Sequence, residues 1–247
     1  MYHFFVDKNN ICDNTVVIDG TDFNHIKNVL RMKEGEELSV GTGEDENDYR
    51  CMIERFEDDR VICKLMFVKK ADVELPSKVT LYQCLPKADK MEMIIQKCVE
   101  LGVSEIVPVS SKRCVVKLDD KKASGKVSRW QAIAEAAGKQ SKRAIVPHIN
   151  EVLSFKDAIK KADDADIKLI PYELSEDIDD TKKLLAEIKP GESIAFFIGP
   201  EGGFDETEVE TAVNAGFKPI SLGRRILRTE TAGLTLMAWL VYLLEIR

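Results

Sequence analysis

The stretch IAFFIGPEGGFDETEVE, residues 194–210, indicates a strand, a glycine-rich loop and a helix in the second half of the chain. An apolar run ends in Gly-Pro-Glu-Gly-Gly, and a polar segment typical of a helix follows. Glycines between a strand and a helix indicate that backbone approaches something closely. The loop is neither a P-loop nor a Gly-x-Gly-x-x-Gly turn. Pro200 removes a backbone donor and Glu201 repels phosphate, which favours a neutral or cationic ligand. The alternative is a turn that merely ends the strand.

Around this stretch, strands alternate with helices from residue 79 onward. This pattern predicts a parallel α/β sheet that is covered by helices on both faces. We expect strands at 79–85, 105–109, 167–172, 193–199 and 218–223, and helices at 90–101, 128–138 and 231–246. The first helix has one apolar stripe, and Gly102 ends it. The stripe consists of Met91, Ile94, Ile95, Cys98 and Leu101.

A second loop, LGRRILRTETAG at 222–233, follows the last expected strand. Parallel sheets bind ligands at the carboxyl ends of their strands, where both loops lie. Ile226 and Leu227 are costly to expose unless they pack on a core or line a ligand pocket. The alternative is a solvated turn in which Thr229 or Thr231 caps the last helix. The apolar face of that helix suits a core or a subunit contact equally.

The first seventy residues have the short strands and turns of a small β-barrel or sandwich. We expect strands at 4–7, 37–43, 49–56 and 60–68, and one helix at 22–32. That helix would begin with Asp22 as its N-cap and end at Gly35. Its apolar face would hold Phe23, Ile26, Val29 and Leu30. A polar joint at 69–78 separates this module from the α/β part.

Composition limits the classes of function. The net charge is −7, yet residues 71–160 carry 16 Lys/Arg against 11 Asp/Glu. This basic middle third could form a nucleic-acid surface on an acidic protein, or it could solvate helix faces. Six cysteines without a Cys-x-x-Cys pair indicate reduced, buried thiols, and three separated histidines argue against a metal centre. No apolar run is long enough to span a membrane, and the N-terminus lacks signal-peptide features, so we expect a cytoplasmic protein.

The two glycine loops together resemble the RsmE family, the bacterial 16S rRNA (uracil-N3)-methyltransferases of the SPOUT superfamily. Three further segments are similar to that family: HIKNVLRMKEGEEL (25–38), LPKADKMEMIIQKCVELGVSEIVPV (85–109), and the central RW (129–130) with EAAGKQSKRAIVPHI (135–149). The resemblance implies a PUA-like β-barrel over residues 1–70. It also implies a SPOUT-type α/β trefoil-knot methyltransferase domain over 73–247.

The resemblance also implies the cofactor and its site. S-adenosylmethionine would bind between the two loops, near the interface of a homodimer. One wall of the pocket would consist of Ile198, Gly199, Pro200, Glu201 and Gly202. The other wall would consist of Leu222, Gly223, Ile226, Leu227 and Arg228.

The implied reaction methylates N3 of a uridine in 16S rRNA, either free or in the 30S subunit. Arg228 would stabilise the developing uracil anion, and Glu230 or water would accept the proton. Neither DNA nor a membrane is an expected partner. Candidate RNA-binding residues are Arg31, Lys33, Arg113, Arg129, Lys139, Gln140, Lys142 and Arg143. His3 stands where family members often have arginine, which would make a contact there depend on pH.

Two alternatives remain open. A SPOUT methyltransferase could act on another RNA atom, such as a ribose 2′-hydroxyl or a tRNA base. A PUA-containing protein without catalytic activity could bind RNA or assist ribosome assembly; the intact loops argue against it.

Overall fold

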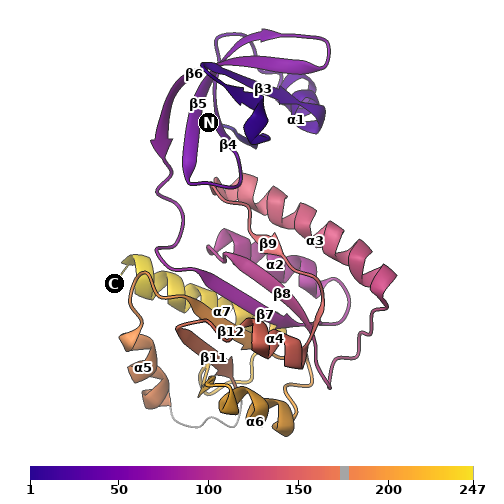
Figure 1. The fold of residues 1–247 in the computed structure, drawn as a ribbon, viewed down its shortest axis with the longest axis vertical. Helices are drawn as coiled ribbons and strands as arrows, with labels where there is room; N and C mark the ends of the chain where they lie inside the picture. Colours follow the sequence, from indigo (N-terminus) through magenta and orange to yellow (C-terminus); the bar gives the residue numbers. More distant parts are fainter. Residues whose placement is uncertain (173–177, 247) are drawn as a thin grey trace. The chain divides into compact units, whose positions relative to one another are not determined.

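The computed structural model describes residues 1–172 and 178–246 (Figure 1). These residues divide into two compact units. The first comprises Met1–Glu74 and Gly138–Val146, and the second comprises Leu75–Ala137 and Pro147–Arg247. The first unit therefore includes a segment from the middle of the sequence. The domain boundaries at residues 70 and 73 stay a prediction.

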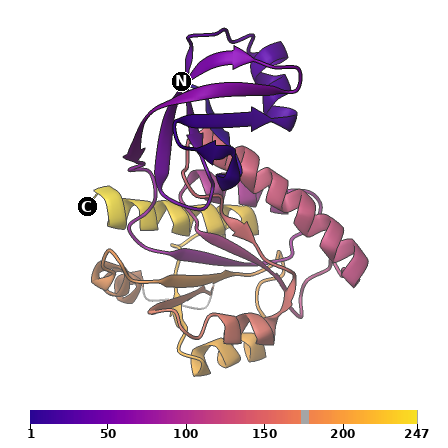
Figure 2. The same cartoon turned by 45° about the horizontal axis from the view of Figure 1, so that its top comes forward.

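The first unit is built on a six-stranded sheet with the order β1-β4-β5-β6-β3-β2. Its strands are β1 (His3–Phe5), β2 (Ile11–Cys12), β3 (Thr15–Asp19), β4 (Glu37–Gly41), β5 (Asn47–Phe56) and β6 (Arg60–Lys70). Only the β1–β4 pair is parallel. The sheet curls around a core that includes Ile18, Leu38 and Ile53 (Figure 2). The four expected strands are confirmed, whereas β2 and β3 were not predicted.

The helix of the first unit differs from the prediction. It consists of α1 (Gly20–Asn24) and a π-helical turn, η2 (His25–Val29). Asp19, not Asp22, occupies the N-cap position. Because a π turn adds a residue per turn, it rotates later side chains away from the face that a regular α-helix predicts. Ile26 is fully buried as expected, but Val29 is 64% exposed, and its assignment to the core face was wrong.

The second unit contains a seven-stranded sheet in which every pair is parallel, as predicted. Its order is β10-β8-β7-β12-β11-β13, and β9 also pairs with β8. The strands are β7 (Val79–Cys84), β8 (Glu105–Ser110), β9 (His148–Ile149), β10 (Leu153–Ser154), β11 (Ile167–Pro171), β12 (Ile194–Ile198) and β13 (Lys218–Ile220). The five expected strands are confirmed, and β9 and β10 are additional.

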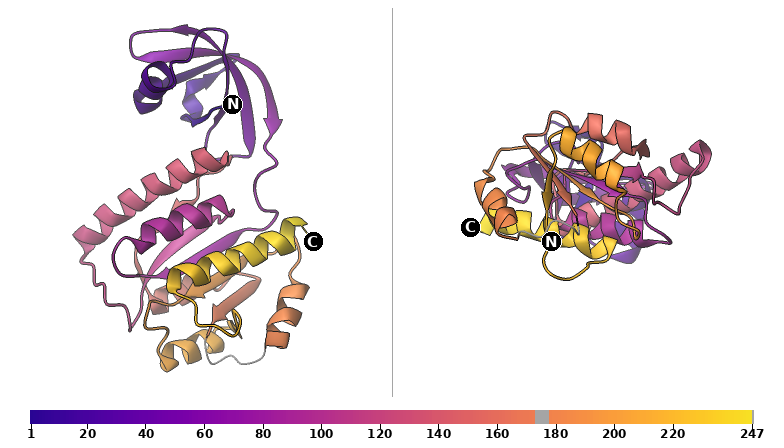
Figure 3. Two further views of the ribbon diagram at one scale, coloured as in Figure 1. Left: turned by 180° about the vertical axis from the view of Figure 1, so that it is seen from behind. Right: turned by 90° about the horizontal axis from the view of Figure 1, so that it is seen from below.

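Helices cover both faces of this sheet, which confirms the layered arrangement. They are α2 (Lys90–Glu100), α3 (Asp120–Ser141), α4 (Phe155–Lys161), α5 (Ile178–Glu187), α6 (Glu206–Asn214) and α7 (Thr229–Val241), which continues into the π turn η3 (Tyr242–Ile246). Helices α2 and α7 lie on one face, and α4 and α6 lie on the other (Figures 1 and 3). Helix α3 begins at Asp120 rather than at 128, and α4 and α5 were not predicted.

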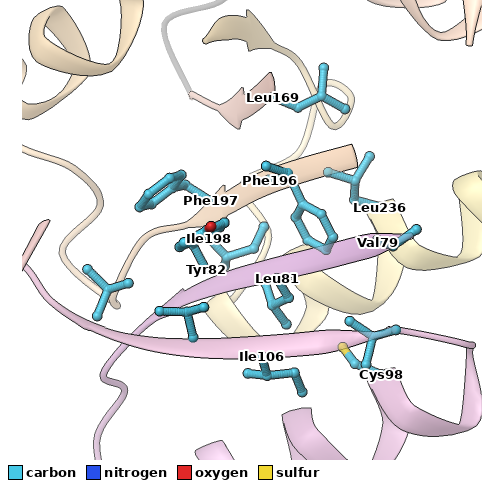
Figure 4. Packing of buried hydrophobic residues seen from close by; sticks show 14 of the residues in the cluster. Val79, Leu81, Tyr82, Cys98, Ile106, Leu169, Phe196, Phe197, Ile198 and Leu236 are labelled. Atoms are coloured by element: carbon cyan, nitrogen blue, oxygen red, sulfur yellow. The ribbon is translucent and has the colours of Figure 1, made fainter. Parts of the chain in front are cut away.

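The core of the second unit lies on both sides of the central strands. Leu81 and Phe196 are neighbours on β7 and β12, with Leu236 of α7 nearby (Figure 4). On the opposite face the rings of Tyr82 and Phe197 stack with centroids 4.6 Å apart. The predicted stripe of α2 is buried except for Leu101, which packs against the core while partly exposed.

The cysteines and the helices agree with an ordinary globular interior. All six cysteines are free, and only Cys12 is exposed. Within residues 1–172 and 178–246, no group of three or more His, Cys, Asp or Glu side chains could hold a metal ion. In the same part of the chain, no helix has the length and apolar character needed to cross a bilayer.

A glycine that ends α2 provides a test of the fold. Gly102 has φ +89°, and an added Cβ would lie 2.8 Å from Leu75 Cγ. Gly102→Ala should therefore lower the free energy of unfolding by about 1–3 kcal/mol. Gly125 lies at an exposed position of α3 with open space around it, so Gly125→Ala should raise stability by about 0.5–1 kcal/mol. Urea unfolding measures both variants. Equal stability of the two would contradict the assigned turn at Gly102.

Candidate functional site

A cavity of about 430 Å³ lies at the carboxyl ends of β12, β11 and β13. Such a volume is typical of small-molecule sites. Its lining comes from the loop after β12, from the end of β11, from the loop after β13, and from the starts of α2 and α7. The lining residues are Lys90, Pro171, Tyr172, Ile198, Gly199, Pro200, Glu201, Gly203, Phe204, Ser221, Leu222, Gly223, Arg224, Arg225, Ile226, Leu227, Arg228, Thr229 and Ala232.

The structure brings the two predicted loops together in this cavity. All residues expected to hold a cofactor line it except Gly202. The Gly202 carbonyl instead accepts a hydrogen bond from Arg113 Nη1 at 3.1 Å. Ile226 lines the cavity but is 88% exposed, so it does not pack on the core. The cofactor-binding roles of these residues stay a prediction.

Glycine is favoured at two positions of the cavity for different reasons. Gly223 has φ +108°, a backbone conformation that side chains with a Cβ rarely adopt. At Gly199 a Cβ would lie 3.3 Å from the ring of Phe204, which is closer than most Cβ contacts in proteins. The glycines thus leave backbone, rather than side chains, facing the cavity at these points.

A buried hydrogen-bond chain joins both loops to the central strand. Gln83 is fully buried at the end of β7, and its Nε2 donates to Thr229 Oγ1 at 3.0 Å and to the Cys84 carbonyl at 3.0 Å. Thr229 Oγ1 in turn donates to the Gly199 carbonyl at 2.6 Å. The interpretation of Thr229 or Thr231 as a helix cap was wrong. Arg228 occupies the N-cap position of α7 and makes no side-chain cap bond.

A charge cluster lies beside the same cavity. Lys90 Nζ lies 3.0 Å from Glu201 Oε1 and 3.3 Å from Glu230 Oε2. Hydrogen bonding to Glu201 is the main reason why the pKa of Lys90 is raised. Burial alone would raise the pKa of Glu201, but donors from its own backbone, Lys90 and Lys87 lower it. Glu230 is directed to Lys90 and does not line the cavity.

The family models match both units. An RNA methyltransferase domain matches residues 73–241, and an RNA methyltransferase PUA domain matches residues 18–66. A ribosomal RNA small subunit methyltransferase E of Bacillus subtilis is 38% identical over 235 residues, which cover 94% of this chain and 91% of the relative. The chain belongs to the ribosomal RNA small subunit methyltransferase E family. The resemblance found in the sequence is thereby confirmed, as are the PUA-like module and the α/β domain.

Solved structures of this family share the fold over nearly the whole chain. A ribosomal RNA small subunit methyltransferase E from Neisseria gonorrhoeae, bound to S-adenosyl methionine, has a TM-score of 0.85 and 33% identity and covers 96% of this chain and 95% of its own. A Legionella pneumophila structure in complex with the cofactor SAM has a TM-score of 0.83 and 30% identity, with coverage of 97% and 95%. The trefoil knot stays a prediction.

Sequence reasoning missed several residues that line the cavity or hold its loops in place. Tyr172 ends an expected strand, so the rule for the carboxyl ends of parallel strands could have identified it. Lys90 and Gln83 carried no signal, because a lysine at the start of a helix and a glutamine in an apolar strand are compatible with many roles. Their function depends on partners more than 100 positions away in the sequence.

The candidate RNA-binding residues have different surroundings. In the second unit, Arg129 pairs with Glu92 at 2.8 Å, and Arg113 contacts Gly202 and Asp205. In the first unit, Lys139 pairs with Asp22 at 2.8 Å. Arg143 is only 3% exposed and forms an ion pair with Glu74, which argues against its predicted contact with RNA. Arg113 and Arg129 stay exposed despite these contacts, and the other exposed candidates are Arg31, Lys33, Gln140 and Lys142.

The hydrogen-bond chain through Thr229 can be tested directly. Thr229→Val keeps the shape of the side chain but leaves Gln83 and the Gly199 carbonyl without this partner. Because both groups are buried or partly buried, the free energy of unfolding should fall by about 1–3 kcal/mol. The matched control, Thr231→Val on the exposed side of α7, should change it by less than about 0.5 kcal/mol. Equal losses in the two variants would contradict the assigned role.

Proposed function

We propose that this chain transfers the methyl group of S-adenosylmethionine to N3 of a uridine in 16S rRNA. The observation that carries the proposal is the single cavity formed by both family loops at the carboxyl ends of β12 and β13. Full-length membership in a family of small-subunit rRNA methyltransferases supports the same reaction.

The described residues suit this cofactor. Apolar side chains of Ile198, Leu222 and Leu227 offer a surface for adenine, and the loop backbone offers polar groups that can fix its orientation. Glu201 supplies a carboxylate at the wall, which favours a cationic ligand. When bound, S-adenosylmethionine supplies an electrophilic methyl group on a positively charged sulfur.

The residues of the chain would contribute orientation and charge. Holding the two reactants in line can account for much of the acceleration. The Arg228 guanidinium is exposed at the cavity and can donate hydrogen bonds to the uracil anion that forms as N3 loses its proton. Because Glu230 is directed to Lys90, water is the proton acceptor that we favour over this carboxylate.

We extend the proposal to the assembly and its location. The partners are 16S rRNA or the 30S subunit and a second copy of the chain, in the cytoplasm where ribosomes are built. Support for a second copy comes from apolar side chains that stay exposed in the second unit. Ile226 at the cavity is 88% exposed, and Tyr242 and Ile246 after α7 are 56% and 69% exposed. A SPOUT trefoil knot formed by the two late loops belongs to the same proposal.

The reaction is tested by mass-spectrometric mapping of methylated nucleosides in 16S rRNA and in tRNA. RNA from cells with the gene should contain a 3-methyluridine that RNA from cells without the gene lacks. A missing ribose methylation or tRNA methylation would instead support the alternative target atom. No difference in any RNA would support a binding protein without catalytic activity.

Arg228 is the residue on which the catalytic part of the proposal depends. Arg228→Ala should lower the single-turnover rate at saturating S-adenosylmethionine by about a hundredfold, the typical effect of removing one donor to a developing anion. Arg228→Lys keeps the charge but loses the planar guanidinium. Its single-turnover rate should therefore lie between the rates of the wild type and Arg228→Ala. An unchanged rate in Arg228→Ala would reject this role.

RNA binding by the first unit can be separated from cofactor binding. Lys142→Glu reverses an exposed charge and should weaken binding of a 16S rRNA fragment about threefold to tenfold, with cofactor affinity unchanged. Lys182→Glu, at an exposed position of α5 in the second unit, serves as the matched control. Fluorescence anisotropy measures both. Equal effects from the two variants would count against a contact at Lys142.

A further inference from the structure

Lys90 lines the cavity and forms ion pairs with carboxylates from two separate segments of the chain. The proposed reaction gives this lysine no role. We propose that Lys90 sets the charge of the site and thereby controls how strongly it prefers S-adenosylmethionine over the demethylated product. This inference rests on the proposed function, because it concerns the same cavity. Lys90 is assigned as a specificity residue, since its charge, together with two carboxylates, sets the electrostatic potential of the cavity.

The geometry places Lys90 between segments that are far apart in sequence. Its Nζ lies 3.0 Å from Glu201 in the loop after β12 and 3.3 Å from Glu230 in the first turn of α7. The three side chains are partly shielded, with exposures of 26%, 27% and 15% for Lys90, Glu201 and Glu230. Shielding from solvent makes their charges act more strongly on a ligand in the cavity than surface charges would.

The cluster holds one cation and two carboxylates, so it carries a net charge of −1. Removing the Lys90 ammonium changes this to −2. Glu201 Oε1 also accepts a hydrogen bond from the Lys87 amide at 3.0 Å, which helps to keep it at the cavity wall. The other charged residues of the lining are Arg224, Arg225 and Arg228, and they are the same before and after the change.

The two nucleosides differ in the charge on sulfur, and the charge cluster interacts with that charge. S-adenosylmethionine carries a sulfonium, and S-adenosylhomocysteine carries a neutral thioether, while their adenosine and amino-acid parts are identical. The ratio of their dissociation constants therefore cancels the shared contacts and reports the electrostatic potential in the cavity. A more negative cavity favours the sulfonium and also opposes the loss of positive charge from sulfur during methyl transfer. Lys90 would thus moderate cofactor affinity in favour of turnover.

The size of the effect follows from Coulomb's law. Removal of one unit charge from a partly shielded site changes the affinity for a cationic ligand by about tenfold. Lys90→Met should therefore raise the preference for S-adenosylmethionine over S-adenosylhomocysteine by about tenfold. The methyl-transfer rate at saturating cofactor should fall.

Isothermal titration calorimetry of both nucleosides with the full chain tests the proposal. Lys90→Arg keeps the charge and should keep the wild-type ratio of the two dissociation constants. The double variant Lys90→Met/Glu201→Gln restores the net charge of −1, so its ratio should return toward the wild-type value. Lys97→Met removes a lysine from the outer part of α2, where it pairs with Glu100, and should leave the ratio unchanged.

The outcomes are distinguishable. A raised ratio in Lys90→Met, with return in the double variant, supports the proposal. Parallel loss of affinity for both nucleosides, or the same ratio change in Lys90→Arg, would overturn it and leave Lys90 a structural residue. If the wild-type chain binds neither nucleoside, the proposed function itself fails, and the role of Lys90 fails with it.

Discussion

The hydrogen bond from Thr229 Oγ1 to the Gly199 carbonyl is the contact on which the site depends. It joins the first residue of α7 to the loop after β12, and Gln83 anchors the pair to the central strand β7. Loops are ordinarily the most variable part of a parallel sheet. Here a buried polar chain fixes the separation of two of them, and the cavity between them follows from that separation. Leaving any of these buried groups unpaired would be costly, so the loops are constrained together.

Charged side chains are likewise paired across distant parts of the chain. Most basic residues of the middle third that suggested RNA contacts are paired with acidic side chains, such as Arg143 with Glu74 and Arg129 with Glu92. Composition could not identify which cations are paired, because the partners come from distant parts of the chain. Arg143 is the clearest case, since its position next to exposed Lys142 in the sequence hides a buried ion pair. A basic segment therefore overstates the surface that RNA can contact.

The sequence predicted the parts of the fold that follow local rules. Apolar strands such as β12 and the stripe of α2 were found because burial leaves a periodic pattern. The loop positions followed from the carboxyl-end rule for parallel sheets. The π turn at 25–29 and the short helices α4 and α5 were missed or misplaced, because their patterns are too short or depart from regular spacing. Gln83 and Lys90 depend on tertiary neighbours, so no local signal could identify them.

The most direct measurement of the central claim is a crystal structure of this chain with S-adenosylmethionine. The account predicts that the nucleoside lies between the loop after β12 and the loop after β13, in contact with backbone near Gly199 and Gly223. A nucleoside bound outside these loops, or a crystal grown at saturating concentration without it, would contradict the account.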